Sequence, residues 1–319
     1  MSLAYADAWD AYWQNACSAD FTDKEVDQPL LSRLWRSLFL EEFRQHCPAI
    51  MLEVACGKGA VSEIARHCME EIPGPSPTHL CLDYSLAAVK TSCQRANPDA
   101  GLVADAARLP LQPGSVDLIF SQFGIEYAGK EAILECARLL RKNGLFSALI
   151  HYRESAISME SQNNHAALSQ VEASLIFARA RVLFKAGFAT SGSPEADPAF
   201  RQADQSLAPA VSQVTAVLQR FGPGVAGGIV LQFYRDLGQM FNNMQAYELT
   251  AILDWLDRME QELLSYRQRM ASMLGAAMDA GQITQTAQQL ETCGLKVEKC
   301  SPIESEQGIL AWHLQGRAR

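Results

Sequence analysis

Short apolar runs alternate with amphipathic stretches between about residues 50 and 150. The runs AIMLEVAC, HLCLDYS, AGLVADA, VDLIFSQF and LFSALIHY predict buried strands, because nearly every position in them is apolar or small. The stretches AVSEIARHCMEEI, LAAVKTSCQRAN and KEAILECARLLRKNG have the period of a helix, and Gly144 is expected to cap the last one. Repeated strand–helix units of this kind predict an α/β fold with a parallel sheet covered on both faces.

The alternation stops at about residue 155, and helical patterns follow until about residue 280. Two stretches rich in glycine and proline, SGSPEADPAF and FGPGVAGG, interrupt this block. Apolar residues then recur at helical spacing from Asn243 to Met278. An unbroken helix there would be about 50 Å long at 1.5 Å per residue, so we expect it to kink or to pack against a partner.

Strand patterns return near the C-terminus, so the helical block interrupts the sheet. A helix is expected over TAQQLETCG, followed by strands over LKVEKCSPI and GILAWHLQG. Residues 3–46 are expected to be helical, with Tyr5, Trp9, Tyr12 and Trp13 on one face. The predicted division is an N-terminal helical segment at 1–46, an α/β core at 47–154, a helical insertion at 155–283, and a closing helix and strands at 284–319.

Composition restricts the function classes. The chain of 319 residues is 48% hydrophobic and 20% charged, which is ordinary for a globular protein. A net charge of −9 without a basic run argues against a nucleic-acid partner. Nine scattered cysteines without a CxxC pair indicate reduced thiols in the cytoplasm and no metal motif. No apolar stretch approaches the ~18 residues of a membrane span, and no secretory signal pattern is seen.

The residues that suit chemistry stand where predicted strands end. In an open parallel sheet, ligands bind beyond the carboxyl ends of the strands. One such end carries Glu53 and the glycine turn Gly57-Lys-Gly59, a second carries Asp83, and a third carries the pair Asp105-Ala106. Glycines at the first end let the backbone approach a ligand closely.

This combination resembles the class I S-adenosylmethionine-dependent methyltransferases. In that family an acid precedes a glycine-rich turn, another acid ends the second strand, and an Asp-Ala pair precedes a segment like LPLQPGSVDLI. The resemblance covers about residues 50–150 and a closing hairpin near 284–315. It implies a Rossmann-like, mostly parallel seven-stranded sheet with helices on both faces, interrupted by the insertion. One departure is Ala55, where the family usually has glycine; its methyl group is costly only if φ is positive.

The resemblance also implies roles in binding S-adenosyl-L-methionine. Glu53 would face the ammonium group, Asp83 the ribose diol, and Asp105 with the Ala106 backbone the adenine. Aromatic residues of N-terminal helices often close over the cofactor in this family, so Tyr5 and Tyr12 are also candidate contacts. The predicted cofactor-binding residues are Glu53, Ala55, Gly57, Gly59, Asp83, Tyr84, Asp105, Ala106, Ser121, Gln122 and Tyr12.

The cofactor would carry the reactive methyl group, so the protein must supply positioning and a base for the acceptor's proton. The candidate catalytic residues are Glu126, Tyr127 and His151. His151 ends a predicted strand on the ligand side, and a free imidazole titrates near ~6.5. A structural, hydrogen-bonded role fits His151 equally well. Tyr127 fits packing or substrate lining better than proton transfer, because the pKa of a free tyrosine is ~10.

Other functions remain open at this point. GKGAVS approximates the dinucleotide fingerprint, and Asp83 follows at nearly the spacing of its ribose-binding acid, so an NAD(P)-dependent oxidoreductase is one alternative. Glu53 and Asp105-Ala106 have no role in that fingerprint, which favours the methyltransferase. A phosphate-binding Walker loop is excluded, because no Ser or Thr follows Lys58. A cofactor-binding module and a protein methyltransferase, each holding a protein partner through the insertion, are further alternatives.

The acidic charge and the absence of basic runs favour a small-molecule acceptor over a nucleic acid. The acceptor atom, whether oxygen, nitrogen or carbon, is undetermined. The insertion is expected to cover the active site, to form a homodimer interface, or both. No membrane contact and no metal ion is expected.

Overall fold

The computed structural model describes residues 9, 10, 12, 13, 29–190, 194–306 and 308–319. The chain forms two compact units, one containing Met1–Met159 and Ser272–Arg319 and the other containing Glu160–Ala271. The second unit therefore lies a few residues inside the limits 155–283 expected for the insertion. Most of the N-terminal segment, including the candidate contact Tyr5, lies outside the described residues.

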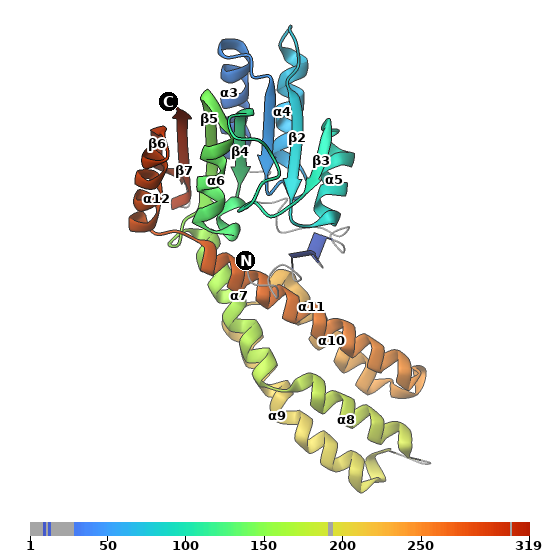
Figure 1. The fold of residues 1–319 in the computed structure, drawn as a ribbon. Coiled ribbons are helices and arrows are strands. Elements are labelled where there is room, and N and C mark those ends of the chain that lie inside the picture. Colours follow the sequence, from blue (N-terminus) through green and yellow to red (C-terminus); the bar gives the residue numbers. More distant parts are fainter. Residues whose placement is uncertain (1–8, 11, 14–28, 191–193, 307) are drawn as a thin grey trace. The chain divides into compact units, whose positions relative to one another are not determined.

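A seven-stranded sheet is the frame of the first unit (Figure 1). Its order is β3-β2-β1-β4-β5-β7-β6, with β1 to β5 parallel and β7 antiparallel to both of its neighbours. The mostly parallel Rossmann-like sheet expected from the sequence is therefore confirmed. The strands are β1 (Ile50–Val54), β2 (Thr78–Asp83), β3 (Ala100–Val103), β4 (Val116–Gln122), β5 (Leu140–His151), β6 (Leu295–Ser305) and β7 (Gly308–Ala318).

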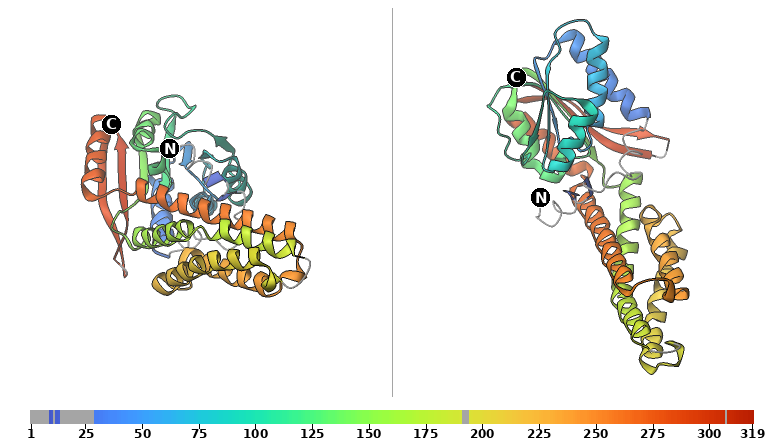
Figure 2. Two further views of the ribbon diagram at one scale, coloured as in Figure 1. Left: turned by 90° about the horizontal axis from the view of Figure 1, so that it is seen from below. Right: turned by 90° about the vertical axis from the view of Figure 1, so that its right-hand side faces the viewer.

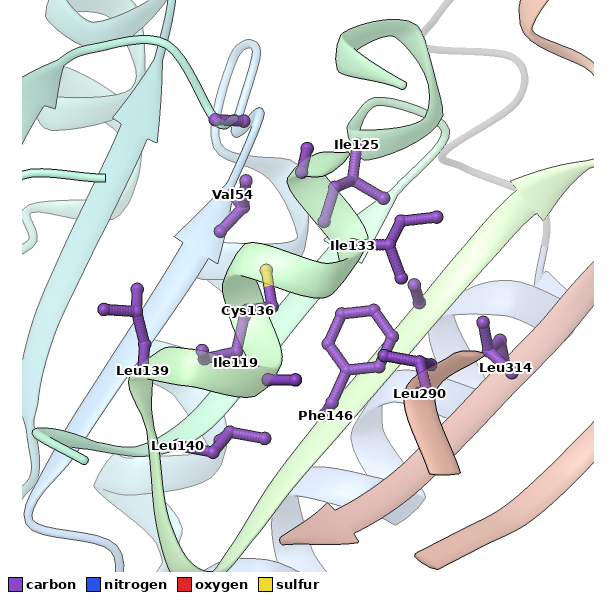
Figure 3. Packing of buried hydrophobic residues seen from close by; sticks show 14 of the residues in the cluster. Val54, Ile119, Ile125, Ile133, Cys136, Leu139, Leu140, Phe146, Leu290 and Leu314 are labelled. Atoms are coloured by element: carbon purple, nitrogen blue, oxygen red, sulfur yellow. The ribbon is translucent and has the colours of Figure 1, made fainter. Parts of the chain in front are cut away.

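Helices cover both faces of this sheet (Figures 1 and 2). One face carries α3 (Pro29–Gln45), α4 (Ala60–Glu71) and α5 (Leu86–Ala96), and the other carries α6 (Lys130–Leu139) and α12 (Ala280–Thr292). Beneath α6 and α12, Cys136 and Leu290 pack with Ile119 and Phe146 of the sheet (Figure 3). The strands carry apolar side chains on both faces, and helices bury both faces. The near-continuous apolar runs in the sequence predicted this arrangement.

One predicted boundary is wrong. We expected a helix over residues 130–144 with Gly144 as its cap, but α6 ends at Leu139 and β5 begins at Leu140. Leu140 pairs with Val116 of β4, and Gly144 lies inside the strand. A Cβ at Gly144 would stand 3.1 Å from the carbonyl oxygen of Asp117, so the glycine serves close strand packing rather than a helix cap.

The second unit is helical. Its elements are α7 (Ala156–Ala173), α8 (Ile176–Ala189), η2 (Pro194–Ala196), α9 (Pro198–Phe221), η3 (Val225–Gly228), α10 (Ile229–Asn242), η4 (Met244–Ala246) and α11 (Leu249–Ala276), of which α7 begins and α11 ends in the first unit. Both predicted breaks fall between long helices. The helix α11 runs unbroken for 28 residues, or about 42 Å.

The helices of the second unit have their own core. The ring centroids of Phe177 and Phe233 lie 4.5 Å apart, and Trp255 stacks on Phe233 at 5.6 Å. Arg181 on α8 forms ion pairs with Asp257 and Glu260 on α11. These contacts explain the aromatic and apolar stripes as internal packing. No helix in the described part of the chain is long and apolar enough to cross a membrane.

Candidate active site

The turn from β1 to α4 requires unusual backbone angles. The φ angles of Ala55, Gly57 and Gly59 are +55°, +49° and +74°. A Cβ at Gly57 would stand 3.0 Å from the Trp13 ring, and one at Gly59 would collide with Ser92. Both glycines are thus required by conformation and by space. The condition under which the Ala55 methyl group is costly is met, and an L-residue in this region costs about 1–2 kcal/mol.

Asp83 ties this turn to the next one. One carboxylate oxygen accepts the Gly57 N–H and the other accepts the Ser85 N–H, each at 2.9 Å. Burial raises the pKa of Asp83, and nearby Asp10 raises it further. Asp10 in turn accepts a 2.5 Å hydrogen bond from the Ser85 hydroxyl. The Tyr84 backbone N–H also donates to the Asp83 carboxylate. A carboxylate has about four lone-pair sites, so Asp83 can still accept from a ligand hydroxyl.

Glu53 lies buried below the glycine turn. Its Oε2 accepts hydrogen bonds from the backbone N–H and the hydroxyl of Ser62, in the first turn of α4. The Ser62 hydroxyl also lies 2.8 Å from Nε2 of His79. Burial raises the pKa of Glu53 well above its ordinary value. The carboxyl therefore anchors α4 to β1, and its contact with a cofactor ammonium group remains a prediction.

Three predicted residues follow β2 and β3. Tyr84 comes directly after Asp83 and is 53% exposed, so its ring face is open to a flat ligand. The exposed carboxylate of Asp105 accepts the Ala107 N–H at 2.9 Å, which fixes the turn. Ala106 is buried. The structure places all three at the carboxyl edge of the sheet, as predicted from the strand ends.

The two predicted residues at the end of β4 differ in what they can reach. Ser121 is fully buried and accepts the Ile125 N–H at 3.2 Å, which stabilises the turn after the strand. Gln122 accepts a 2.5 Å hydrogen bond from the indole of Trp35 through its Oε1. An indole N–H can only donate, so this contact fixes the orientation of the Gln122 amide.

His151 and Glu126 form a buried pair where β4 and β5 end. Nδ1 of His151 lies 2.7 Å from Oε1 of Glu126, and the His151 backbone N–H donates to the same oxygen at 3.0 Å. The two side chains are 2% and 0% exposed. A carboxylate only accepts, so Nδ1 carries the proton and Nε2 holds the basic lone pair.

A series of aromatic rings in mutual contact extends from this pair to the glycine turn. The ring centroids of Phe123 and Tyr127 lie 4.4 and 5.8 Å from that of His151. Trp9 packs edge-on to Tyr127 at 5.3 Å and stacks with Trp13 at 6.1 Å. Tyr12 contacts both tryptophans, so it belongs to this cluster.

Sequence reasoning missed two members of the site. Phe123 has φ of +51°, a conformation that no sequence pattern announces for a phenylalanine. Asp10 reaches Ser85, 75 positions away along the chain, and only the folded structure brings them together. Among the described residues, no group of three or more His, Cys, Asp or Glu side chains is arranged to hold a metal ion.

One family model matches the α/β core. A Rossmann-like sheet with a glycine turn and an acid-ended second strand defines a nucleotide-type cofactor site at its carboxyl edge. Residues 52–148 match the family model described as a methyltransferase domain. Over these residues, the match agrees with the resemblance to S-adenosylmethionine-dependent methyltransferases expected from the sequence.

Several solved structures are similar to the chain. One is the Haemonchus contortus phosphoethanolamine N-methyltransferase 1 with phosphoethanolamine and S-adenosylhomocysteine, at 16% identity over 48% of this chain and 34% of that chain, with a TM-score of 0.34. Another is N-methyltransferase NodS from Bradyrhizobium japonicum with S-adenosyl-L-homocysteine, at 15% identity, 46% and 74% coverage and a TM-score of 0.36. A third is the citrinin polyketide synthase CMeT domain, at 16% identity, 41% and 38% coverage and a TM-score of 0.36.

The matched region of this chain thus spans less than two thirds of two of these three structures. The sequence matches no curated protein. Two of the residues present suit the cofactor of the class: Asp83 can still accept a hydrogen bond, and Tyr84 is exposed. 

Proposed function

We propose that the protein transfers a methyl group from S-adenosylmethionine to a small-molecule acceptor, with His151 as general base. The observation that carries this proposal is the buried His151–Glu126 pair. It lies at the ends of β4 and β5, on the same edge of the sheet as the glycine turn and Asp83. A base at this edge can reach an acceptor placed beside the cofactor.

In this proposal, the chain's own residues orient the reactants and move one proton. The bound cofactor supplies a methyl group already activated by its sulfonium. The glycine turn and Asp83 hold the cofactor. Nε2 of His151 accepts the acceptor's proton, and Glu126 stabilises the resulting imidazolium through Nδ1–H. The aromatic cluster of Trp9, Trp13 and Tyr127 excludes water from the acceptor.

The remaining parts of the function are also proposals. A net charge of −9 favours a small molecule over a nucleic acid. The second unit serves as a cover for the acceptor or as a homodimer interface. The eight described cysteines form no disulfide with one another, which supports a cytoplasmic location.

The test is a product assay. Purified full-length protein is incubated with S-adenosylmethionine and a panel of small amines, alcohols, phenols and carboxylic acids, and S-adenosylhomocysteine is measured by mass spectrometry. Formation of this product together with one methylated member of the panel is the expected result. Product that appears only when a protein fraction is added would instead support a protein methyltransferase.

A further inference from the structure

Only one carboxylate oxygen of Glu126 accepts hydrogen bonds from the described part of the chain. Its Oε1 accepts both hydrogen bonds from His151, whereas Oε2 has no hydrogen-bond partner in the described part of the chain. The side chain is 0% exposed, so bulk solvent does not contact it. A buried acceptor without a donor destabilises the folded protein, and more so when it is charged. Such a cost is offset if a ligand brings the donor.

A cluster of five aromatic residues begins at this pair, with Phe123 and Tyr127 against His151 and Trp9 against Tyr127. Phe123, Tyr127, Trp9, Tyr12 and Trp13 are all half-buried, unlike the fully buried phenylalanines of the sheet core. The faces of aromatic rings carry partial negative charge and attract cations. An aliphatic wall would exclude water equally well but would not favour a positive charge.

The charged residues at this edge also favour a cationic ligand. Asp10 and Asp83 lie on the cofactor side and Glu126 on the acceptor side, against Lys58 on the glycine turn. An anionic acceptor such as a carboxylate or phosphate would be repelled by these acids. A phenol would have to develop a negative oxygen close to the Glu126 carboxylate, which is unfavourable for the same reason.

We propose that the acceptor is a cationic amine, bound as the ammonium ion by Glu126 and the aromatic faces; this rests on the proposed function. The ammonium gives one proton to Nε2 of His151. The freed nitrogen lone pair then forms the N–C bond to the methyl group as the C–S bond breaks, and that electron pair stays on sulfur. The products are a methylated ammonium, S-adenosylhomocysteine and a proton, which leaves through His151.

The experiment compares two probes of one shape. Protein saturated with S-adenosylhomocysteine is titrated with benzylamine and with benzyl alcohol in a calorimeter, at a pH where the amine is charged. We expect benzylamine to bind at least about tenfold more tightly, because desolvated cation–π and ion-pair contacts favour the cation. Glu126→Gln is expected to abolish this difference, whereas Glu131→Gln, an exposed carboxylate on α6, leaves it unchanged.

A second pair of variants tests the aromatic contribution. Tyr127→Phe keeps a ring face and should retain the preference for the amine, whereas Tyr127→Leu should reduce it severalfold. Equal or tighter binding of benzyl alcohol, or no binding of either probe at millimolar concentration, would overturn the amine proposal. Failure of S-adenosylhomocysteine itself to bind would overturn the proposed function as well, so the two failures are distinguishable.

Discussion

The buried acids at the carboxyl edge of the sheet differ in their hydrogen bonding between its two halves. On the β1–β2 half, both oxygens of Asp83 accept backbone N–H groups, and Ser62 donates twice to Glu53. On the β4–β5 half, Glu126 uses one oxygen for His151 and leaves the other without a donor among the described residues. Asp83 thus has both oxygens paired within the described part of the chain, whereas Glu126 has one oxygen left for a ligand.

This difference indicates a division of labour. The β1–β2 half is a preformed binding surface, since its acids already fix two turns and the start of a helix. In the β4–β5 half, a buried carboxylate oxygen without a donor among the described residues lies next to the His151 imidazole. Such unpaired buried groups are common at sites that bind a substrate and transfer a proton. Variants of the first half should therefore change binding and stability, and variants of the second should change turnover.

The largest expected effect is on turnover at the β4–β5 half. His151→Gln removes the base while keeping a polar side chain of similar length. We expect turnover of the acceptor to fall by about 10²- to 10⁴-fold. Affinity for S-adenosylhomocysteine, measured by calorimetry, should stay within about twofold. A variant with normal turnover would show that His151 is only structural.

On the β1–β2 half, Asp83 should control cofactor affinity. Asp83→Ala removes two hydrogen bonds to the turns and the proposed contact with a ribose diol, so affinity for S-adenosylhomocysteine should fall by about 100-fold or more. Asp83→Asn keeps one accepting oxygen and should lose less, about tenfold. If both variants bind normally, Asp83 does not contact the cofactor.

Glu53 allows a test of stability against pH. Burial raises its pKa in the folded state, so the folded protein holds this proton more tightly than the unfolded chain. Stability is therefore lost as the pH rises above the unfolded value, ~4.3. Glu53→Gln has no such loss, so its Tm relative to the native protein should increase between about pH 4 and pH 8. A Tm difference that does not change with pH would contradict this reasoning.

The smallest expected effect concerns the strained turn. Ala55→Gly removes the cost of positive φ, about 1–2 kcal/mol, but adds about 0.5–1 kcal/mol of backbone entropy, so the net gain is at most about 1.5 kcal/mol. Ala87→Gly, inside α5, makes the same change in helical backbone and should destabilise by about 1 kcal/mol. Stability changes of opposite sign for the two variants, measured by thermal unfolding, would confirm the strain at Ala55. Equal losses of stability would contradict it.

Local patterns explain what could be predicted. The buried strands could be predicted because both their faces are apolar, and Asp83 is a candidate because ligand sites follow strand ends; its contact with a ligand stays a prediction. Gly144 was misplaced because ARLLRKNG fits a helix or a strand, and the pairing of Leu140 with Val116 decides between them. The bonds from Asp83 to two turns and the placement of Phe123 arise from tertiary contacts, which no local pattern encodes.

The most direct test of the central claim is calorimetric titration of the purified protein with S-adenosylhomocysteine, with NAD and NADP as parallel titrants. We expect micromolar binding of S-adenosylhomocysteine that Asp83→Ala weakens strongly and His151→Gln does not. Binding of a nicotinamide cofactor without binding of S-adenosylhomocysteine would contradict it.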